Sequence, residues 1–134
     1  MILVDVDCFK GINDAYGHAT GDAVLKKVAY WLKNEFRNID FACRVGGDEF
    51  AVIMVDVAYD QKNTISDRIA EVNKKLTEQR DGMPAISLSV GVAFSEKENG
   101  DKNIFKDADK ILYYVKEHGK NGCAFFDPEM AGVK

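Results

Sequence analysis

Residues 44–52, RVGGDEFAV, place two glycines directly before two acids and an apolar segment. Glycine suits a tight turn, but adjacent carboxylates such as Asp48 and Glu49 are unfavourable in a hydrophobic core. Asp5 and Asp7 form a second acidic pair, at the end of the first apolar segment. Gathered carboxylates need a cation, and oxygen ligands without a Cys or His cluster favour a hard ion such as Mg²⁺. The pattern indicates either a metal site or a surface hairpin with solvated acids.

Three lysines can supply the positive charge that a phosphate ligand requires. Lys10 follows the first acidic pair, and Lys116 and Lys120 lie at the end of the last periodic apolar segment. Backbone N–H groups of Gly46 and Gly47 can approach an anion closely. Together with the acids, these residue types predict metal-dependent phosphoryl or nucleotidyl transfer.

The composition is that of one ordinary globular domain. The chain has 134 residues, 46% hydrophobic and 30% charged, with a formal net charge of −4. We expect a single domain over residues 1–134. The negative charge argues against a broad nucleic-acid interface, and no apolar run is long enough to span a bilayer. Three cysteines without metal-ligand spacing indicate reduced thiols in a cytosolic protein: Cys8, Cys43 and Cys123.

Hydrophobic periodicity predicts the elements that position these residues. A polar loop is expected after the first strand, a hairpin turn at Gly46-Gly47, and a helix stop near Gly119. A central-looking strand that begins at Ile2 indicates a fragment of a longer chain. The expected strands cover 2–7, 39–45, 50–57, 86–94 and 123–126, and the expected helices cover about 21–36, 65–76 and 104–115.

The element order predicts an α+β fold. It is a ferredoxin-like βαββαβ core with an added C-terminal α-β unit, in which helices flank an antiparallel-rich central sheet. In this plan the first strand lies antiparallel to the strand that leaves the hairpin. The plan therefore brings Asp5 and Asp7 against Asp48 and Glu49.

Four segments resemble the GGDEF domains of bacterial diguanylate cyclases along nearly the whole chain. These segments are VDVDCFKGINDAYGHATGD at 4–22, RNIDFACRVGGDEFAV at 37–52, SLSVGVA at 87–93 and ADKILYYVKEHGKNG at 108–122. The resemblance implies a nucleotidyl cyclase-like fold and an enzyme that joins two GTP molecules into cyclic di-GMP and pyrophosphate. Two domains would meet as a homodimer, and the 3′-hydroxyl of each GTP would attack the α-phosphate of the other.

The resemblance also implies a metal site. Asp5, Asp48 and Glu49 would be metal-binding residues, the Val6 carbonyl would complete the shell, and two Mg²⁺ or Mn²⁺ ions would occupy each active site. Glu49, or Asp48 itself, would help to deprotonate the 3′-hydroxyl, and the motif leaves this choice open. Arg44 would order the acidic turn, or form a simple salt bridge on its strand.

Asn13 and Asp22 match the guanine-recognising pair of the family. A carboxylate can accept from both N1–H and the exocyclic amino group of guanine, whereas adenine would leave it unpaired. Asp22 would also suit a helix N-terminus. Phe9 and His18 line the same loop, and His18 is expected to make a structural or ribose-side contact.

The phosphate-binding positions of the family match Lys10, Lys116 and Lys120. The family commonly has Arg where Lys120 stands, so this chain keeps the charge but lacks the bidentate fork. By the same resemblance, Gly46 and Gly47 would let the turn lie against the nucleotide.

An Arg-x-x-Asp pattern, Arg37 to Asp40, lies five residues ahead of Gly46. In the family this is the site at which cyclic di-GMP inhibits the enzyme. Arg37 would bind a guanine edge or a phosphate of the product, Asp40 would accept from a guanine, and Arg68 is a weaker candidate to complete the site. The alternative is a structural ion pair.

The family segment before the first strand, which leads to an upstream sensory domain, does not appear in this sequence. Cys8 and Val115 also depart from the family pattern. The domain is expected in the cytoplasm, with membrane attachment only through other parts of the full-length protein. We favour the cyclase because the turn acids and the guanine pair are all present. The alternatives are a catalytically silent module that senses GTP or cyclic di-GMP, and a structural ferredoxin-like domain.

Overall fold

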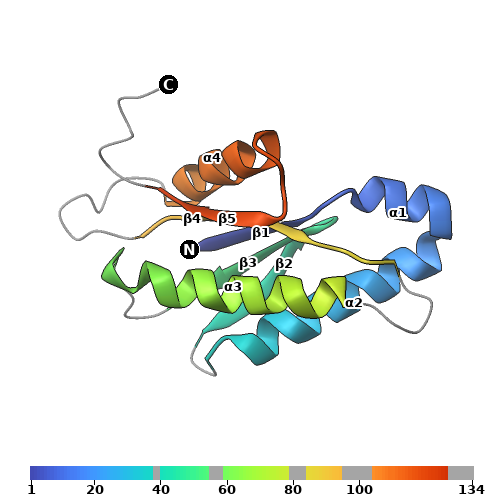
Figure 1. The fold of residues 1–134 in the computed structure, drawn as a ribbon, viewed down its shortest axis with the longest axis horizontal. Coiled ribbons are helices and arrows are strands. Elements are labelled where there is room, and N and C mark those ends of the chain that lie inside the picture. The colour runs from blue at the N-terminus through green and yellow to red at the C-terminus, as the bar shows by residue number, and fades with distance from the viewer. Residues whose placement is uncertain (38–39, 55–58, 79–83, 95–103, 127–134) are drawn as a thin grey trace.

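The computed structural model describes residues 1–37, 40–54, 59–78, 84–94 and 104–126. These residues form a five-stranded sheet in the order β2-β3-β1-β4-β5, with helices on both faces (Figure 1). The strands are β1 (Ile2–Val6), β2 (Phe41–Gly46), β3 (Glu49–Ile53), β4 (Leu88–Val92) and β5 (Gly122–Phe125). The helices are α1 (Phe9–Tyr16), α2 (His18–Glu35), the 3₁₀ helix η1 (Tyr59–Gln61), α3 (Lys62–Thr77) and α4 (Ile104–Glu117).

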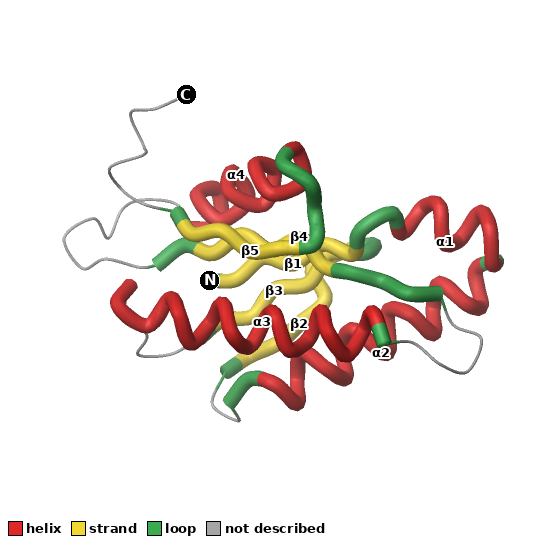
Figure 2. Tube along the Cα trace, viewed as in Figure 1, coloured by secondary structure: helices red, strands yellow, loops and turns green. Residues whose placement is uncertain are grey.

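The sheet has the predicted mixed but mainly antiparallel pairing. β1 lies at its centre, antiparallel to both β3 and β4. β2 pairs with β3 in antiparallel fashion, and β5 adds to β4 in parallel. Helices α2 and α3 cover one face and α4 covers the other (Figures 1 and 2). The expected α+β fold, with β1 beside the strand that leaves the hairpin, is therefore confirmed.

β1 is buried along its whole length because both faces of the sheet are covered there. Ile2, Val4 and Val6 belong to the larger core beneath α2 and α3, whereas Leu3 belongs to the smaller core beneath α4. Side chains alternate between the two faces of a strand, so Asp5 shares the α4 face with Leu3. A strand buried on both faces normally has an uninterrupted apolar sequence, which makes Asp5 an exception to be explained.

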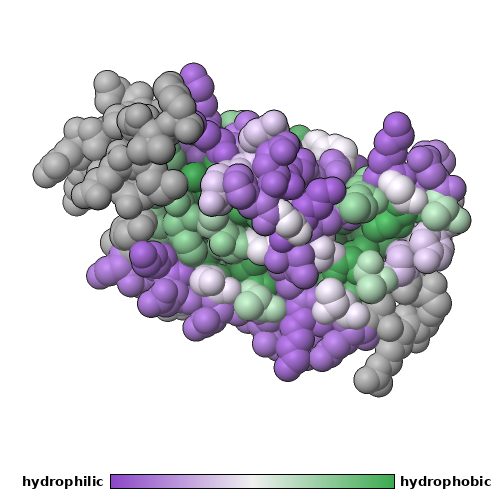
Figure 3. All heavy atoms as spheres, turned by 45° about the horizontal axis from the view of Figure 1, so that its top comes forward, coloured by the Kyte–Doolittle hydropathy of each residue, from purple (hydrophilic) through white to green (hydrophobic). Residues whose placement is uncertain are grey.

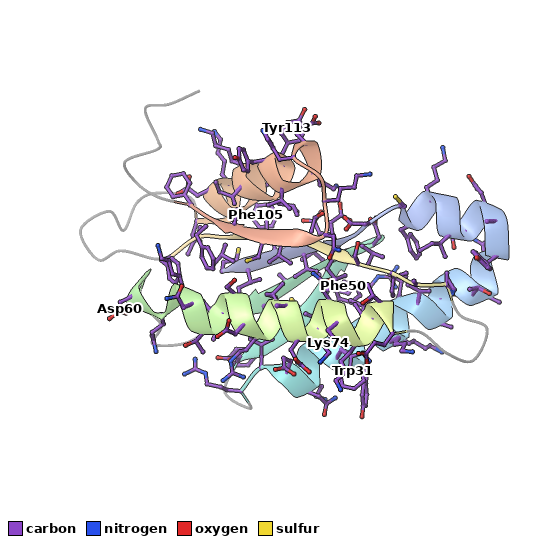
Figure 4. The ribbon with its side chains drawn as sticks, viewed as in Figure 1. Trp31, Phe50, Asp60, Lys74, Phe105 and Tyr113 are labelled. Carbon is purple, nitrogen blue, oxygen red and sulfur yellow. The ribbon has the colours of Figure 1, made fainter. Side chains whose placement is uncertain are left out.

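The larger core is formed by one face of the sheet and the apolar sides of α2 and α3. Phe50 points from β3 into this layer (Figure 4) and is 4% exposed. The outer surface is different in kind: polar side chains cover much of the face in Figure 3, with apolar side chains visible between them. Tyr113, on α4, is 65% exposed (Figure 4). No helix among the described segments has the length and apolar character that a membrane crossing requires.

The predicted polar loop after β1 is wrong over most of its length, because residues 9–16 form α1 and α2 begins at His18. Only Ile12 of α1 is buried, and Phe9 packs against the larger core. Its apolar residues do recur at helical spacing, but the segment is only eight residues long, shorter than the window over which periodicity identifies a helix. The helix depends on its contact with α2. Gly17, at φ 91°, separates the two helices.

The remaining boundaries differ from the predicted ones by a few residues. β3 begins one residue earlier than predicted, and positions 39 and 55–57 of the predicted strands lie outside the described residues. β4 is shorter at both ends, whereas α3 and α4 extend beyond their apolar residues. These ends carry polar residues that periodicity does not detect.

α4 approaches the sheet most closely at Gly91 of β4. A Cβ at this position would lie 2.3 Å from the backbone N of Leu112 and 2.4 Å from the backbone O of Ala108. Neither backbone atom can move without moving the helix. The distance between α4 and the sheet, and with it the position of every residue on α4, therefore depends on a glycine here.

We expect Gly91→Ala to destabilise the chain by roughly 1–3 kcal/mol, because the added methyl group overpacks a rigid contact. The free energy of unfolding in urea measures the effect. Gly11→Ala is the matched control, since a Cβ at Gly11 meets nothing within 4 Å and alanine favours a helix. Equal stability of wild type and Gly91→Ala would show that α4 does not depend on this contact.

Candidate active site

The acidic turn and the end of β1 lie together because of the register of the sheet. Asp5 of β1 pairs directly with Glu49 of β3. The Val6 N–H donates to the Asp48 carbonyl over 3.2 Å. Two acids that follow the Gly46-Gly47 turn are thus placed next to Asp5, more than 40 residues earlier in the chain.

Arg44 holds the turn from the β2 side. Its Nε donates to the carbonyl oxygen of Gly47 over 2.9 Å, and Gly47 has a φ of 37°. The β2–β3 register shifts between Arg44 and Gly46, a local irregularity of the kind that redirects a strand end. The contact fixes the turn without using the carboxylates of Asp48 and Glu49.

Asp5 is the most constrained of these acids. It is 6% exposed, and Oδ2 forms an ion pair with the Lys116 ammonium of α4. Oδ1 is buried and has no hydrogen-bond partner among the described residues. Burial raises the pKa of the Asp5 carboxyl above its ordinary value, and the neighbouring Asp48 raises it further, against the opposing effect of Lys116.

The charges around Lys116 and Glu49 follow the same pattern. Burial lowers the pKa of the Lys116 ammonium, but the carboxylates of Asp5, Asp48 and Glu49 more than compensate, so its pKa is raised overall. Burial raises the pKa of Glu49, and Asp109 and Asp5 add to the rise. The acids thus repel one another, and Lys116 balances only part of their charge.

This arrangement fits a divalent ion that arrives with a phosphate ligand. Among the described residues, no three His, Cys, Asp or Glu side chains form a group that could hold a metal by themselves. Mg²⁺, however, is usually bound by one or two carboxylates with substrate phosphates and water as the other ligands. The free Oδ1 of Asp5, beside Asp48 and the carbonyl of Val6, offers a donor set of that kind.

Asp7 does not belong with these acids, and the expectation that four carboxylates converge is wrong for it. Its Oδ2 accepts from Ser87 Oγ (2.6 Å) and from the Asn121 backbone N–H (3.0 Å). Its Oδ1 accepts from Ser89 Oγ (2.5 Å). Asp7 follows the last residue of β1, and these donors turn its carboxylate toward β4 and the α4–β5 connection.

The two guanine candidates lie at the junction of α1 and α2. Asn13 Oδ1 is buried without a hydrogen-bond partner in the described part of the chain. Asp22 is exposed and, with Arg44 and Phe50, lines a cavity of about 470 Å³ between α2 and the β2–β3 hairpin. His18 is exposed at the start of α2. An orphaned amide oxygen and an exposed carboxylate are both suited to accept from N–H groups of a ligand.

Gly21 is a residue of this junction that the sequence pattern did not single out. A Cβ on Gly21 would lie 1.8 Å from Asn13 Oδ1 and 3.3 Å from the ring of Phe9. The bare backbone of α2 therefore leaves the space that the Asn13 side chain occupies. A glycine in the first turn of a helix, where it weakens the helix, was the available signal.

The three lysines approach the site from two sides. Lys10 is exposed on α1, and Lys116 contacts Asp5 from α4. Lys120 lies in the turn after α4, and its Nζ is 3.8 Å from Cys8 Sγ, next to the end of β1. The positive charges thus lie around the same strand end as the acids.

The Arg-x-x-Asp segment forms a separate feature at the C-terminal end of α2. Arg37 donates to both carboxylate oxygens of Asp40, from Nε (3.1 Å) and from the terminal guanidinium nitrogen (2.8 Å). Arg68 donates to the Glu35 carbonyl over 2.5 Å. Arg37 and Arg68 line one small cavity of about 90 Å³, so these two predicted residues are brought together.

Comparison with known proteins gives a consistent result. The family model described as "Diguanylate cyclase, GGDEF domain" matches residues 1–122. Diguanylate cyclase A of Treponema denticola is 37% identical over 123 residues, which cover 90% of this chain and 33% of that protein. Diguanylate cyclase DosC of Escherichia coli K12 is 34% identical over 90% of this chain and 27% of its own length. The chain spans about a third of the length of the curated relatives it matches.

Solved structures with the same fold include two close in sequence. The GGDEF domain of DgcB from Caulobacter crescentus, in complex with c-di-GMP, has a TM-score of 0.82 and 30% identity, covering 92% of this chain and 75% of its own. The active GGEEF domain of a diguanylate cyclase from Vibrio cholerae has a TM-score of 0.80 and 29% identity, covering 94% of this chain and 81% of its own.

If Lys116 balances the acids, its loss must leave Asp5 in need of another cation. We expect Lys116→Met to lower the free energy of unfolding by about 1–2 kcal/mol. Millimolar Mg²⁺ should then raise the melting temperature more in the variant than in wild type, since a bound ion stabilises by mass action. Lys110→Met, an exposed lysine on the same helix, is the control. A Mg²⁺ response that is the same in all three proteins would contradict this role.

Proposed function

The chain belongs to the GGDEF domain family, and on that basis we propose that it is a catalytic domain that condenses two GTP molecules into cyclic di-GMP and pyrophosphate. The observation that carries the proposal is the meeting of Asp5, Asp48 and Glu49 at one end of the sheet, next to Lys116. Carboxylates that repel one another are stable there only with cations. The divalent ion that accompanies a nucleoside triphosphate supplies the missing positive charge.

Asp5, Asp48 and the carbonyl of Val6 are the groups that would hold the ion, as Mg²⁺ or Mn²⁺ and in two copies. When bound, such ions stabilise the negative charge that develops on the attacking and leaving oxygens. The chain's own residues then have separate tasks. With an ion on Asp5, the Lys116 ammonium would be available to bind the phosphates, and Arg44 keeps the turn fixed.

Glu49 is the better candidate for proton acceptor from the 3′-hydroxyl. It lies beside Asp5 in the sheet and remains partly exposed at the turn, where a substrate hydroxyl can come within hydrogen-bond distance of its carboxylate. Asp48, as an ion ligand, has its lone pairs engaged.

Asn13 and Asp22 support guanine as the base. The buried oxygen of Asn13 and the exposed carboxylate of Asp22 can accept from the N1–H and amino groups that distinguish guanine from adenine. An adenine in the same place would leave both acceptors unpaired, which costs more than the lost contact alone. Gly21 leaves the space that the Asn13 side chain occupies.

One domain supplies one GTP site, whereas the product needs two bond-forming steps between two nucleotides. The active species is therefore a homodimer in which the two turns face each other. In the full-length protein an upstream regulatory domain would control this pairing, and the catalytic domain would act in the cytoplasm. The curated relatives are about three times as long as the region that matches this chain, and the rest of their length can hold such a domain.

Cyclic di-GMP would inhibit the enzyme by binding at Arg37 and Asp40. Arg68 lines the same cavity as Arg37, and its buried Nε has no hydrogen-bond partner among the described residues. The Arg37–Asp40 pair would open so that the guanidinium contacts a guanine edge or a phosphate and the carboxylate accepts from a guanine.

The proposal predicts cyclic di-GMP when the concentrated chain is incubated with GTP and Mg²⁺, as detected by mass spectrometry. Asp48→Ala should reduce the product by at least about 100-fold, because it removes one ion ligand from the reacting centre. Asp60→Ala is the control, since Asp60 is an exposed acid of η1 (Figure 4). A chain that is dimeric by fusion to a coiled coil, binds GTP and forms no product would instead be a silent sensor.

Guanine selection predicts a separate result for Gly21→Ala. The added methyl group would displace the flexible Asn13 side chain, so stability should change little while the apparent affinity for GTP falls about 10-fold, or 1.4 kcal/mol.

The preference for GTP over ITP, which lacks the exocyclic amino group, should also narrow in Asp22→Asn. Gly11→Ala, on the adjoining helix, should leave both quantities unchanged. A folded Gly21→Ala chain that binds GTP with wild-type affinity would contradict a role for Asn13 in base recognition.

A further inference from the structure

Asp7 is a buried carboxylate that the proposed reaction does not use. It is 8% exposed and accepts three hydrogen bonds, from Ser87, Ser89 and the Asn121 backbone. Its own N–H donates to the Ser87 carbonyl over 3.0 Å. A carboxylate in such a place is costly unless it is hydrogen-bonded, and the three bonds that Asp7 accepts satisfy its carboxylate.

The three donors come from segments that are far apart in the sequence. Ser87 and Ser89 lie at the start of β4, and Asn121 lies in the connection from α4 to β5. The two serine hydroxyls fix the orientation of the carboxylate. The N–H of Asn121 connects the carboxylate to the α4–β5 turn, outside the sheet. Asp7 therefore fastens the α4–β5 turn to the end of β1.

The turn needs an external attachment because its backbone is unfavourable. Lys120 has a φ of 59° and Asn121 a φ of 44°, directly after Gly119 at 108°. A lysine in the left-handed region costs about 1–2 kcal/mol, whereas asparagine adopts this region more readily. The Lys120 N–H donates back to the Val115 carbonyl over 3.0 Å, and the Asn121 N–H to Asp7. These two bonds hold the turn at both ends of its strained part.

The residue held between these two bonds is Lys120. Its ammonium extends to Cys8, the neighbour of Asp7, and therefore lies at the strand end that also carries Asp5. A long lysine side chain has large rotamer freedom, so the direction of its first bonds decides where the charge can reach. Asp7 sets that direction through the backbone of Asn121.

We propose that Asp7 is a positioning residue that fixes the Lys120 ammonium for the outer phosphates of the nucleotide. The proposal rests on the function inferred above and extends it to a residue outside the ion and guanine sites. It predicts a change in phosphate affinity opposite to the one that charge alone would give. Removing a negative charge near a phosphate site should by Coulomb's law strengthen phosphate binding, whereas loss of positioning should weaken it.

The test measures binding rather than turnover. The probes are α,β-methylene-GTP, which keeps the triphosphate but cannot lose pyrophosphate, and GMP, which lacks the outer phosphates. Both are titrated in Mg²⁺ into wild type, Asp7→Asn, Lys120→Ala and the double variant. The asparagine is nearly the same size as the aspartate, but it cannot accept from both serines and from Asn121 at once.

Asp7→Asn should weaken the triphosphate analogue about 3- to 10-fold, which corresponds to the net contribution of one ordinary hydrogen bond. GMP binding should change by less than about twofold. If Asp7 acts through Lys120, the same substitution should add almost nothing in the Lys120→Ala background. Asp14→Asn, an equal change of charge at an exposed position of α1, should not weaken the analogue.

Three results would overturn the proposal: equal losses for the analogue and GMP, a full additional loss in the Lys120→Ala background, or no loss in Asp7→Asn. If Asp7→Asn is not folded at the assay temperature, Ser89→Ala takes its place, because it frees Oδ1 and keeps the carboxylate. It should give a smaller loss with the same preference for the analogue, and a loss shared by GMP counts against the proposal. A wild-type chain that binds neither probe would contradict the proposed function instead.

Discussion

The central constraint of this structure is the burial of two carboxylates at the end of β1. A strand covered on both faces has no water to solvate Asp5 and Asp7, so each must be compensated by protein groups or by a ligand. Asp5 receives the ammonium of Lys116. Asp7 receives two hydroxyls and a backbone N–H. Helix α4, the start of β4 and the turn before β5 are each attached to β1 through one of these two acids.

The two acids are compensated in different ways, and the difference fits their different roles. The partner of Asp5 is a half-exposed lysine, a mobile charge that an ion can replace, and one oxygen of Asp5 has no partner in the described residues. The partners of Asp7 are fixed by the sheet and by a turn, so that its carboxylate has little capacity left for a ligand. Asp5 thus belongs to a site that can exchange a lysine for a bound ion, and Asp7 belongs to the scaffold that supports that site.

Much of this site could be predicted from the sequence, because residue types and strand register were enough to bring Asp5 beside Glu49. The alternation of Ile2 to Val6 and the glycine turn fix that register. Other features depended on tertiary contacts that no local pattern carries. Helix α1 is only eight residues long and buries only Ile12, too short a segment for its helical spacing to identify it, and the direction of Asp7 is set by serines about 80 residues away. The space that Gly21 leaves for Asn13 appears only once two helices are packed.

The central position of β1 has a consequence for how the chain is made. Of the described strands, β1 leaves the ribosome first, but its partners follow much later: Ile2 pairs with Val52 of β3 and with Val92 of β4. One backbone edge of β1 therefore remains unpaired until β3 has been synthesised, and the other until β4 has been synthesised. Such long-range pairing slows folding. During synthesis from the N-terminus, the strand that carries Asp5 and leads to Asp7 is therefore made long before its partners. Its exposed apolar segment is of the kind that chaperones bind.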